Sequence, residues 1–366
     1  MSFQVQRLGA LAIACLCSHP ALSNTLERSF LAGLTDGFVL SGSYTYFDSE
    51  LDVIGYLDAL PAGARPDQYD QSKIEIGYKL GNWQPYARYQ KVEGSVVRPS
   101  RPFEVASDAD YVTVGAVYSV GDAGQGRAAR FSLSEAKQAE VTIDCYERSG
   151  VILGGSCSEA DFQLIDGDLL LETGESVAFP VLTSSANALT AELALDWWRQ
   201  WSNLPLLIGQ RLTIKATEVE HDSYSPLYDL QSSFLLNTPF NGVSLGSLIS
   251  DLKDDLPQSD PWSEAVGRYD VSANLFVGNW IFGGTVGGMY VKRFGYDDPM
   301  GRAQYDTNAS AAGYVWYQFE KATVFLEAEA FSNYLLGVDP LAYTSKSSRF
   351  FEHPYGQLTI GFIATF

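Results

Sequence analysis

Hydrophobic and polar residues alternate one by one along most of the chain, which is the period of a β-strand with one apolar face. The segment KIEIGYKL at residues 73–80 shows the pattern: its even-numbered positions are all apolar, and its odd-numbered positions are Lys, Glu, Gly and Lys. Twelve segments behave in this way, and an even number of strands suits a closed antiparallel barrel. The predicted strands are residues 38–47, 73–80, 83–97, 111–120, 130–143, 189–201, 206–220, 269–277, 280–294, 309–319, 323–331 and 357–366.

The joins between these strands also alternate, in length. Every second join is mostly short, whereas the others are long. This arrangement is typical of a transmembrane β-barrel with short periplasmic turns and long extracellular loops. Two short turns are Gly-Asn, which suits a positive φ, and Trp83 and Trp280 follow them as a predicted interfacial girdle. The long joins are residues 48–70, 99–109, 145–187, 222–267, 297–305 and 336–354.

A soluble β-sandwich is the alternative fold for an alternating sequence. Two packed sheets favour aliphatic cores, but here the apolar positions mix Tyr, Trp, Gly and Ala with Leu and Val. The alternation of long and short joins favours the barrel further. Composition adds that the 366 residues carry 24 basic and 44 acidic side chains, for a net charge of −20. Such an acidic chain is not expected to bind nucleic acid.

The N-terminus has the features of an export signal. Arg7 precedes an apolar run at residues 8–16, which is too short to cross a bilayer as a helix. Ala21 and Ser23 are small residues at the two positions that a signal peptidase reads, so residues 1–23 are predicted to be removed. Residues 24–366 would then form a single barrel domain. Lipid attachment at Cys15 is the weaker alternative, since the sequence before it lacks the usual Leu.

Export determines the redox environment of the cysteines that remain after the signal is removed. Cys15 and Cys17 would leave with the signal, whereas Cys145 and Cys157 would reach an oxidising compartment. We therefore expect these two to form a disulfide within a long loop. A redox site would need a Cys-x-x-Cys spacing, which the sequence lacks.

The last strand, LTIGFIATF at residues 358–366, alternates apolar residues and ends on Phe366. It resembles the C-terminal strand of Gram-negative outer-membrane β-barrel proteins. The resemblance implies a place in the bacterial outer membrane, contact with its lipids, and recognition of Phe366 by the barrel-assembly machinery. It identifies a superfamily and no particular member.

The short turns also predict the register of two hairpins, because opposed residues in a hairpin sum to a constant. A sum of 163 places Glu75 opposite Arg88, and a sum of 407 places Glu192 opposite Lys215 and Asp196 opposite Arg211. Opposite charges paired across strands support both the register and the choice of the polar face as the lumen. The predicted lumen residues are Glu75, Arg88, Glu192, Asp196, Arg211, Lys215, Asp270, Arg293, Glu327 and Glu329.

The long loops carry two further signals. Apolar residues spaced three and four apart predict an amphipathic helix in residues 241–257, capped by Asn241 or Ser244. Acidic residues gather outside the predicted strands and would give the outer mouth a negative field. Calcium binding by these acidic residues is the weaker alternative, because no calcium-loop motif is present. The acidic residues are Asp48, Glu50, Asp52, Asp58, Asp67, Asp70, Asp251, Asp254, Asp255 and Asp260.

These features predict a passive, narrow, porin-like channel for small polar solutes, with a lumen of mixed charge. One alternative is a plugged structural barrel that acts through its acidic extracellular loops. The other is a lipid hydrolase using His221 and Ser223, since outer-membrane phospholipase and lipid A deacylase use a His-x-Ser pair. Against it, those families continue with Asn and Gly, and this chain has Tyr224 and Ser225. No cofactor or metal site is expected, because no matching motif is present.

Overall fold

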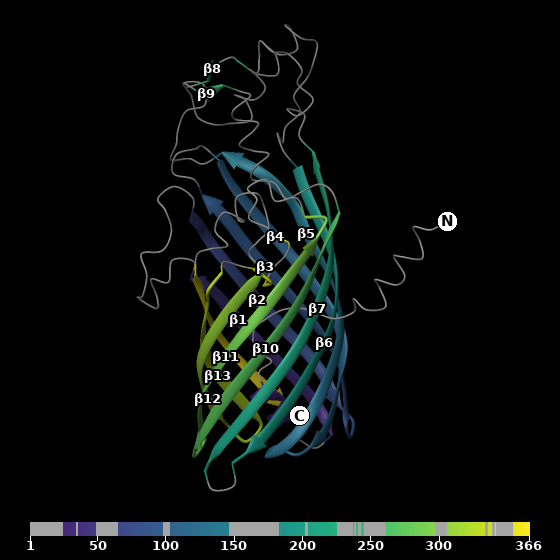
Figure 1. The fold of residues 1–366 in the computed structure, drawn as a ribbon, viewed down its shortest axis with the longest axis vertical. Coiled ribbons are helices and arrows are strands. Elements are labelled where there is room, and N and C mark those ends of the chain that lie inside the picture. The colour runs from purple at the N-terminus through teal and green to yellow at the C-terminus, as the bar shows by residue number, and fades with distance from the viewer. Residues whose placement is uncertain are drawn as a thin grey trace, which may run out of the picture.

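The computed structural model describes residues 25–33, 36–48, 65–97, 103–145, 183–201, 204–224, 237, 239–240, 243–244, 261–296, 306–333, 336–338, 341 and 354–366. Twelve strands form one closed antiparallel barrel, in the order β1-β14-β13-β12-β11-β10-β7-β6-β5-β4-β3-β2 (Figure 1). The predicted closed barrel is therefore confirmed. Its strands are β1 (Gly37–Asp48), β2 (Arg65–Lys79), β3 (Trp83–Val97), β4 (Phe103–Gly121), β5 (Gln125–Cys145), β6 (Thr183–Gln200), β7 (Leu206–Tyr224), β10 (Trp262–Val277), β11 (Trp280–Phe294), β12 (Thr307–Gln318), β13 (Ala322–Phe331) and β14 (Tyr355–Thr365).

The barrel closes where its first and last strands meet. β1 and β14 are antiparallel, from Val39 opposite Thr365 to Asp48 opposite Gly356. At the short-turn end, the backbone N–H of Phe38 donates to the carbonyl of Phe366 at 3.2 Å, and Phe366 returns the bond at 3.0 Å. Closure of this kind removes every unpaired sheet edge, as a barrel in lipid requires.

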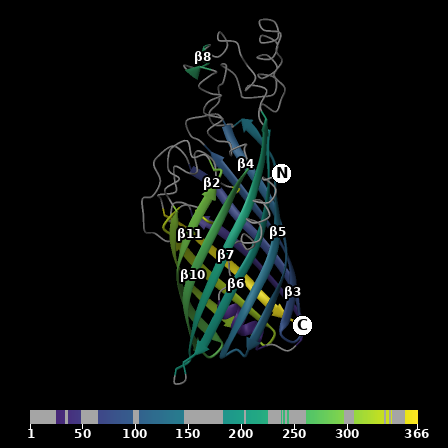
Figure 2. The same ribbon diagram turned by 45° about the vertical axis from the view of Figure 1, so that its right-hand side comes forward.

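Four adjacent strands are longer than the sequence pattern predicted. β4, β5, β6 and β7 contain 19, 21, 18 and 19 residues, whereas about 9–11 suffice to cross a bilayer. They stand side by side and rise above the rest of the barrel at the long-loop end (Figures 1 and 2). The added residues lie mainly at the outer ends of β4, β6 and β7 and at the inner end of β5, where ladder hydrogen bonds continue past the predicted segments.

The placement of three acidic residues outside the strands was wrong. Asp48 is the last residue of β1, and Asp67 and Asp70 lie in β2, where Asp70 pairs with Tyr46. The Asp70 side chain is buried. Backbone pairing extends this hairpin beyond the apolar alternation that marks its lipid-facing part.

The outer face of the barrel is apolar. Outward residues along the strands include Ile76, Val114 and Val286, each more than half exposed. Trp83 and Trp280 lie on the outer face at the short-turn end. Trp83 contacts Tyr118, with ring centroids 4.8 Å apart. Phe366 is 74% exposed at the same end. An apolar wall with aromatic residues at its rim suits the boundary between lipid and water.

Two segments that do not belong to the wall lie inside the barrel. One is the short helix α2 (Thr25–Ala32), which packs at the short-turn end. The other comprises Leu336–Val338 and Leu341, from the connection between β13 and β14, and we call it the inward turn. No helix in the described ranges is long and apolar enough to cross a membrane.

Three predictions concern segments that the structure does not describe in full. The predicted helix cannot begin at Asn241, because Val243–Ser244 forms the strand β9 and pairs with β8 (Pro239–Phe240). Residues 245–257 lie outside the described residues. The signal segment, residues 1–23, also lies outside them, as does Cys157, so the disulfide with Cys145 stays a prediction.

Gly283 is a position where the barrel interior depends on the absence of a side chain. An added Cβ would overlap the ring of Tyr314, whose hydroxyl donates to Asn274 Oδ1 at 2.8 Å. We expect Gly283→Val to lower the free energy of unfolding by about 1–3 kcal/mol through overpacking, measured by denaturant unfolding in detergent micelles. Gly288→Val is the control, because nothing lies within 4 Å of an added Cβ there. Equal losses in the two variants would contradict the expectation.

Candidate functional site

The lumen of the barrel is the candidate site, because its wall carries many ionisable side chains. Alternate residues of each strand face inward, and the charged residues predicted for the lumen follow this parity. Arg293 is half-buried near the outer end. A role in conduction stays a prediction for all of them. The buried members are Glu75, Arg88, Glu192, Asp196, Arg211, Lys215, Asp270, Glu327 and Glu329.

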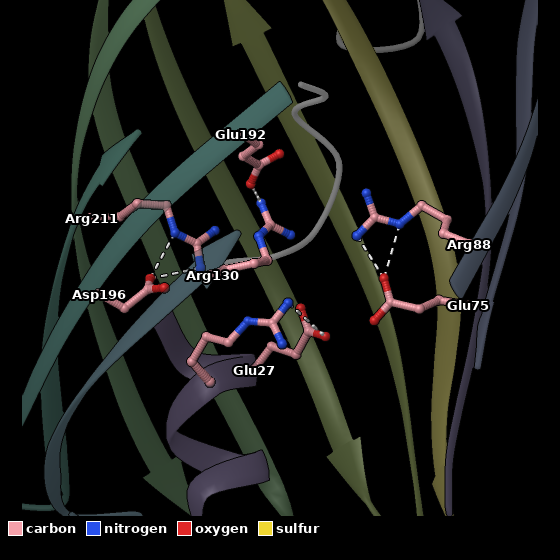
Figure 3. A network of polar contacts seen from close by, with 8 residues as sticks. Glu27, Glu75, Arg88, Arg130, Glu192, Asp196 and Arg211 are labelled. Carbon is pink, nitrogen blue, oxygen red and sulfur yellow. Dashed lines mark hydrogen bonds and ion pairs between the residues drawn. The ribbon is translucent and has the colours of Figure 1, made fainter. Parts of the chain in front are cut away.

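Each of the two predicted hairpin registers places an ion pair in the lumen. Glu75 lies opposite Arg88, whose Nη2 is 2.6 Å from Glu75 Oε2. Asp196 lies opposite Arg211, whose Nη2 is 2.6 Å from Asp196 Oδ1 (Figure 3). Both pairs are almost inaccessible to solvent. In such surroundings the attraction between the charges is strong, and an unpaired member is costly.

The third predicted pair is opposed in the backbone but makes other ionic contacts. Glu192 lies opposite Lys215, and the ion pair shown for Glu192 is with Arg130 of β5 (Figure 3). Lys215 Nζ lies 3.7 Å from Glu264 Oε1 on β10. Each of these charges therefore pairs with the strand on its other side and not with its hairpin partner. This is possible because side chains reach diagonal as well as direct neighbours.

Arg130 and Arg268 are lumen residues that the sequence argument missed. Arg268 Nε lies 2.8 Å from Asp270 Oδ1, and Arg268 Nη2 lies 2.9 Å from Glu329 Oε1. We call these contacts and the pairs of Arg88, Arg130 and Arg211 the ion-pair belt. Arg130 already showed the correct parity in its predicted strand. Its partner lies across the long join between β5 and β6, and a long join leaves the register open.

Helix α2 fills the short-turn end of the lumen beneath the ion-pair belt (Figure 3). Leu26 and Leu31 belong to one apolar cluster with inward residues of the wall, including Tyr86, Trp198 and Trp316. We call this cluster the helix layer. An eight-residue helix is marginal by itself in water, so packing against the wall is what stabilises it.

Lys79 attaches the C-terminal end of α2 to the barrel wall. Its Nζ donates to the carbonyls of Leu31 and Ala32 at 2.5 and 2.8 Å. A lysine at this end satisfies carbonyls that the helix leaves free and opposes the negative end of its dipole. Within α2, Arg28 is buried beside Glu27, and its Nη2 lies 3.7 Å from Glu27 Oε1.

The inward turn fills the lumen near the long-loop end. Leu336, Val338 and Leu341 are buried in a second apolar cluster, which we call the turn layer, together with inward residues such as Met289 and Val291. Lys215 Nζ donates to the carbonyl of Gly337 at 2.9 Å. Gly337 has a φ of 74°, which favours glycine, and an added Cβ would lie 2.8 Å from Val291 Cγ2.

The inward-facing apolar residues of both layers were also missed. The alternation predicts that the apolar residues of each strand face lipid and that the polar ones face the lumen. Trp198, however, shares the inward face of β6 with Glu192 and Asp196. The lumen therefore consists of an ion-pair belt between two apolar layers. Such layers can obstruct a path for ions and hydrated solutes, while the belt can attract them.

The hydrolase candidate has one residue in the lumen wall. His221 is buried on the inward face of β7, and neither ring nitrogen has a hydrogen-bond partner among the described residues. Ser223 lies two residues further along β7, opposite Ser184. A catalytic imidazole needs a third group to orient it. No residue in the described part of the chain forms a hydrogen bond to His221 that would orient it.

The described residues also contain no group of three or more His, Cys, Asp or Glu side chains placed to hold a metal ion.

Comparison with solved structures decides the class of the fold. The translocator domain of the autotransporter NalP from Neisseria meningitidis matches with a TM-score of 0.51 and 10% identity, covering 100% of this chain and 95% of that one. The chain has the fold of an outer-membrane β-barrel protein. At this identity the likeness concerns the fold, and it agrees with the closed barrel and its apolar exterior.

Two further solved structures match with lower TM-scores. The β domain of the Bordetella autotransporter BrkA has a TM-score of 0.48 at 11% identity, covering 91% of this chain and all of that one. The NanC porin has a TM-score of 0.36 at 9% identity, covering 90% of this chain and 99% of that one. No family model matches the sequence. No curated protein matches it either.

Proposed function

We propose that the protein is a narrow, gated channel for small polar solutes, closed in the described state by α2 and the inward turn. The observation that carries the proposal is a stripe of polar side chains along the inner face of β3. Gln84, Tyr86, Arg88 and Gln90 follow one another on this face, and all four are buried. The stripe extends from the helix layer past the ion-pair belt.

Several polar atoms along the stripe favour a hydrated lumen over a dry, packed one. Gln84 Nε2, the Tyr86 hydroxyl and Gln90 Nε2 have no hydrogen-bond partner among the described residues. Leaving such a group unpaired in a dry interior costs about 1–3 kcal/mol. Water in the lumen would satisfy these groups. A barrel with a purely structural role would gain stability from apolar side chains at the same positions.

The two internal segments have the properties expected of gates. Each contributes apolar residues to the lumen. Side chains of the wall bind their backbone carbonyls: Lys79 binds those of α2, and Lys215 and Asn308 bind those of the inward turn. Because neither belongs to the barrel ladder, either one can leave the lumen without breaking a hydrogen bond between barrel strands. A conducting state therefore does not require the barrel itself to open.

Planar-bilayer recording tests the proposal. The purified protein is expected to give discrete current steps with a preference for one sign of ion, because the lumen charges act over a short, weakly screened path. Glu192→Ala should shift the reversal potential measured in a salt gradient toward anions. Glu135→Ala should not, because Glu135 is exposed on the outer face. If Glu192→Ala behaved like Glu135→Ala, the lumen charges would play no part in selectivity.

The two other functions predict different results. A structural or surface-interaction barrel would give no current steps. A lipid hydrolase would turn over phospholipid or lipid A, and Ser223→Ala would abolish this activity. Unchanged turnover in Ser223→Ala would reject Ser223 as the nucleophile.

A further inference from the structure

A groove on the outside of the barrel combines aromatic, apolar and cationic side chains, and the proposed channel function gives it no role. It has a volume of about 850 Å³ and runs over β6, β7 and β10 near the short-turn end. Its outward side chains include Trp197, Trp201 and Leu212. Both tryptophans are more than two-fifths exposed, so the groove opens toward the surrounding membrane. Indole rings of this kind favour the boundary between headgroups and acyl chains.

Two arginines lie at the headgroup end of this groove. Arg199 is part of its lining. Arg127 lies opposite Trp197 on the neighbouring strand, and Gln125 lies opposite Arg199, so the two arginines are diagonal neighbours on the outer face. Diagonal neighbours of a sheet lie about 7–8 Å apart, and long side chains bridge that distance. Both arginines are exposed.

These two outward charges are both positive, whereas the outward charges at the other end of the barrel include both signs. There, Lys91 pairs with Glu93, and Lys137 pairs with Glu135. At the short-turn end, the outward charges on the described strands are the cations Arg127 and Arg199. The nearby turn residue Asp122 uses Oδ1 to accept from the backbone N–H groups of Gly124 and Gln125. In a chain of net charge −20, this local excess of arginine favours an anionic ligand.

A hydrogen-bonding pair lies deeper in the groove. The Tyr269 hydroxyl donates to Gln210 Oε1 at 3.1 Å, and no described group accepts from the Gln210 amide nitrogen. Arg199 lies opposite Ile208, so Gln210 is two residues further from the short-turn end than the arginine. Two strand residues correspond to about 7 Å. Beyond Gln210, Leu212 and Ile214 continue the outward face with apolar side chains.

We propose that this groove binds one glycerophospholipid of the periplasmic leaflet. The phosphate would lie between Arg127 and Arg199, which suit it because guanidinium groups bind phosphate oxygens in pairs. The Gln210 amide would donate to an ester carbonyl, and the acyl chain would follow Leu212 and Ile214. The order of cation, amide donor and apolar surface along the groove matches the order of phosphate, ester and hydrocarbon in such a lipid.

Native mass spectrometry of the full-length, delipidated protein tests this proposal, with palmitoyl-oleoyl phosphatidylglycerol as the probe. One saturable lipid adduct is expected. The double variant Arg127→Gln/Arg199→Gln should raise its Kd by about tenfold or more, the loss of a charge-assisted contact. Lys292→Gln is the matched control, because it removes an outward cation at the opposite end. Equal Kd values in the double variant and the control would overturn the proposal.

A second comparison isolates the ester contact. Gln210→Leu should weaken binding of the diester lipid but leave binding of the ether-linked lipid with the same headgroup unchanged, since the ether lacks the carbonyl. Glycerol phosphate alone should not displace the bound lipid, because it cannot occupy the apolar part of the groove. Equal weakening for diester and ether lipids, or displacement by glycerol phosphate, would contradict the proposed binding mode.

Discussion

Deleting α2, residues Thr25–Ala32, is expected to raise the fraction of time that the channel is open by roughly threefold or more, because one of the two segments that close the lumen of the twelve-stranded barrel is then absent. The remaining wall keeps every strand-to-strand ladder, so the deleted protein should still form the barrel. Planar-bilayer recording of the refolded protein measures the fraction of time spent open, and the gel mobility of unheated samples reports folding.

Lys79→Met gives a milder form of the same experiment. It removes the bonds to the Leu31 and Ala32 carbonyls while leaving the helix in the chain, so the channel should open more often without a larger step size. Lys321→Met is the control, because it removes an exposed positive charge from a short turn at the same end of the barrel. An unchanged open fraction after deletion of α2 would show that the helix does not gate the channel.

Asp196→Ala is expected to cause the largest loss of stability among single substitutions in the ion-pair belt. The Asp196 side chain is fully buried, and its removal leaves the Arg211 guanidinium buried without its carboxylate partner. Breaking a buried pair in this way costs about 3–5 kcal/mol. The midpoint of denaturant unfolding in detergent micelles should therefore move to a much lower concentration.

Glu135→Ala provides the comparison with an exposed pair. Glu135 Oε1 lies 3.0 Å from Lys137 Nζ, but both side chains are more than half exposed. Exposed pairs of this kind contribute about 0–1 kcal/mol. A similar loss in Asp196→Ala and Glu135→Ala would mean that water reaches the Asp196–Arg211 pair freely and that the belt does not stabilise the closed lumen.

The strand pattern was predictable wherever one face of a strand meets lipid. β3 and β11 have the predicted ends, because Trp83 and Trp280 follow tight Gly-Asn turns and the alternation continues without interruption. β4, β6 and β7 were underestimated at their outer ends, where backbone pairing continues past the predicted segments. Hydrogen bonds between backbones do not depend on side-chain pattern, so their extent is not readable from it.

The ion pairs of the candidate site were predictable only where a short turn joins the two strands. Glu75 and Arg88 are joined by a short turn, and so are Asp196 and Arg211, so counting residues gave the register and the pairs. Arg130 and Glu192 are separated by a long join, and Arg268 meets Glu329 across several strands of the closed sheet. Such contacts depend on closure and on side-chain direction, which no local pattern encodes.

The sequence by itself determined the strand-rich barrel, the side of each strand that meets lipid, and the register of hairpins with short turns, because all three follow from local alternation and turn length. Only the tertiary structure decided what occupies the interior. Leu26 and Leu336 lie far apart in the chain, yet both fill the lumen. Burying their apolar surface requires a closed wall around them, and that wall exists only after β1 has paired with β14.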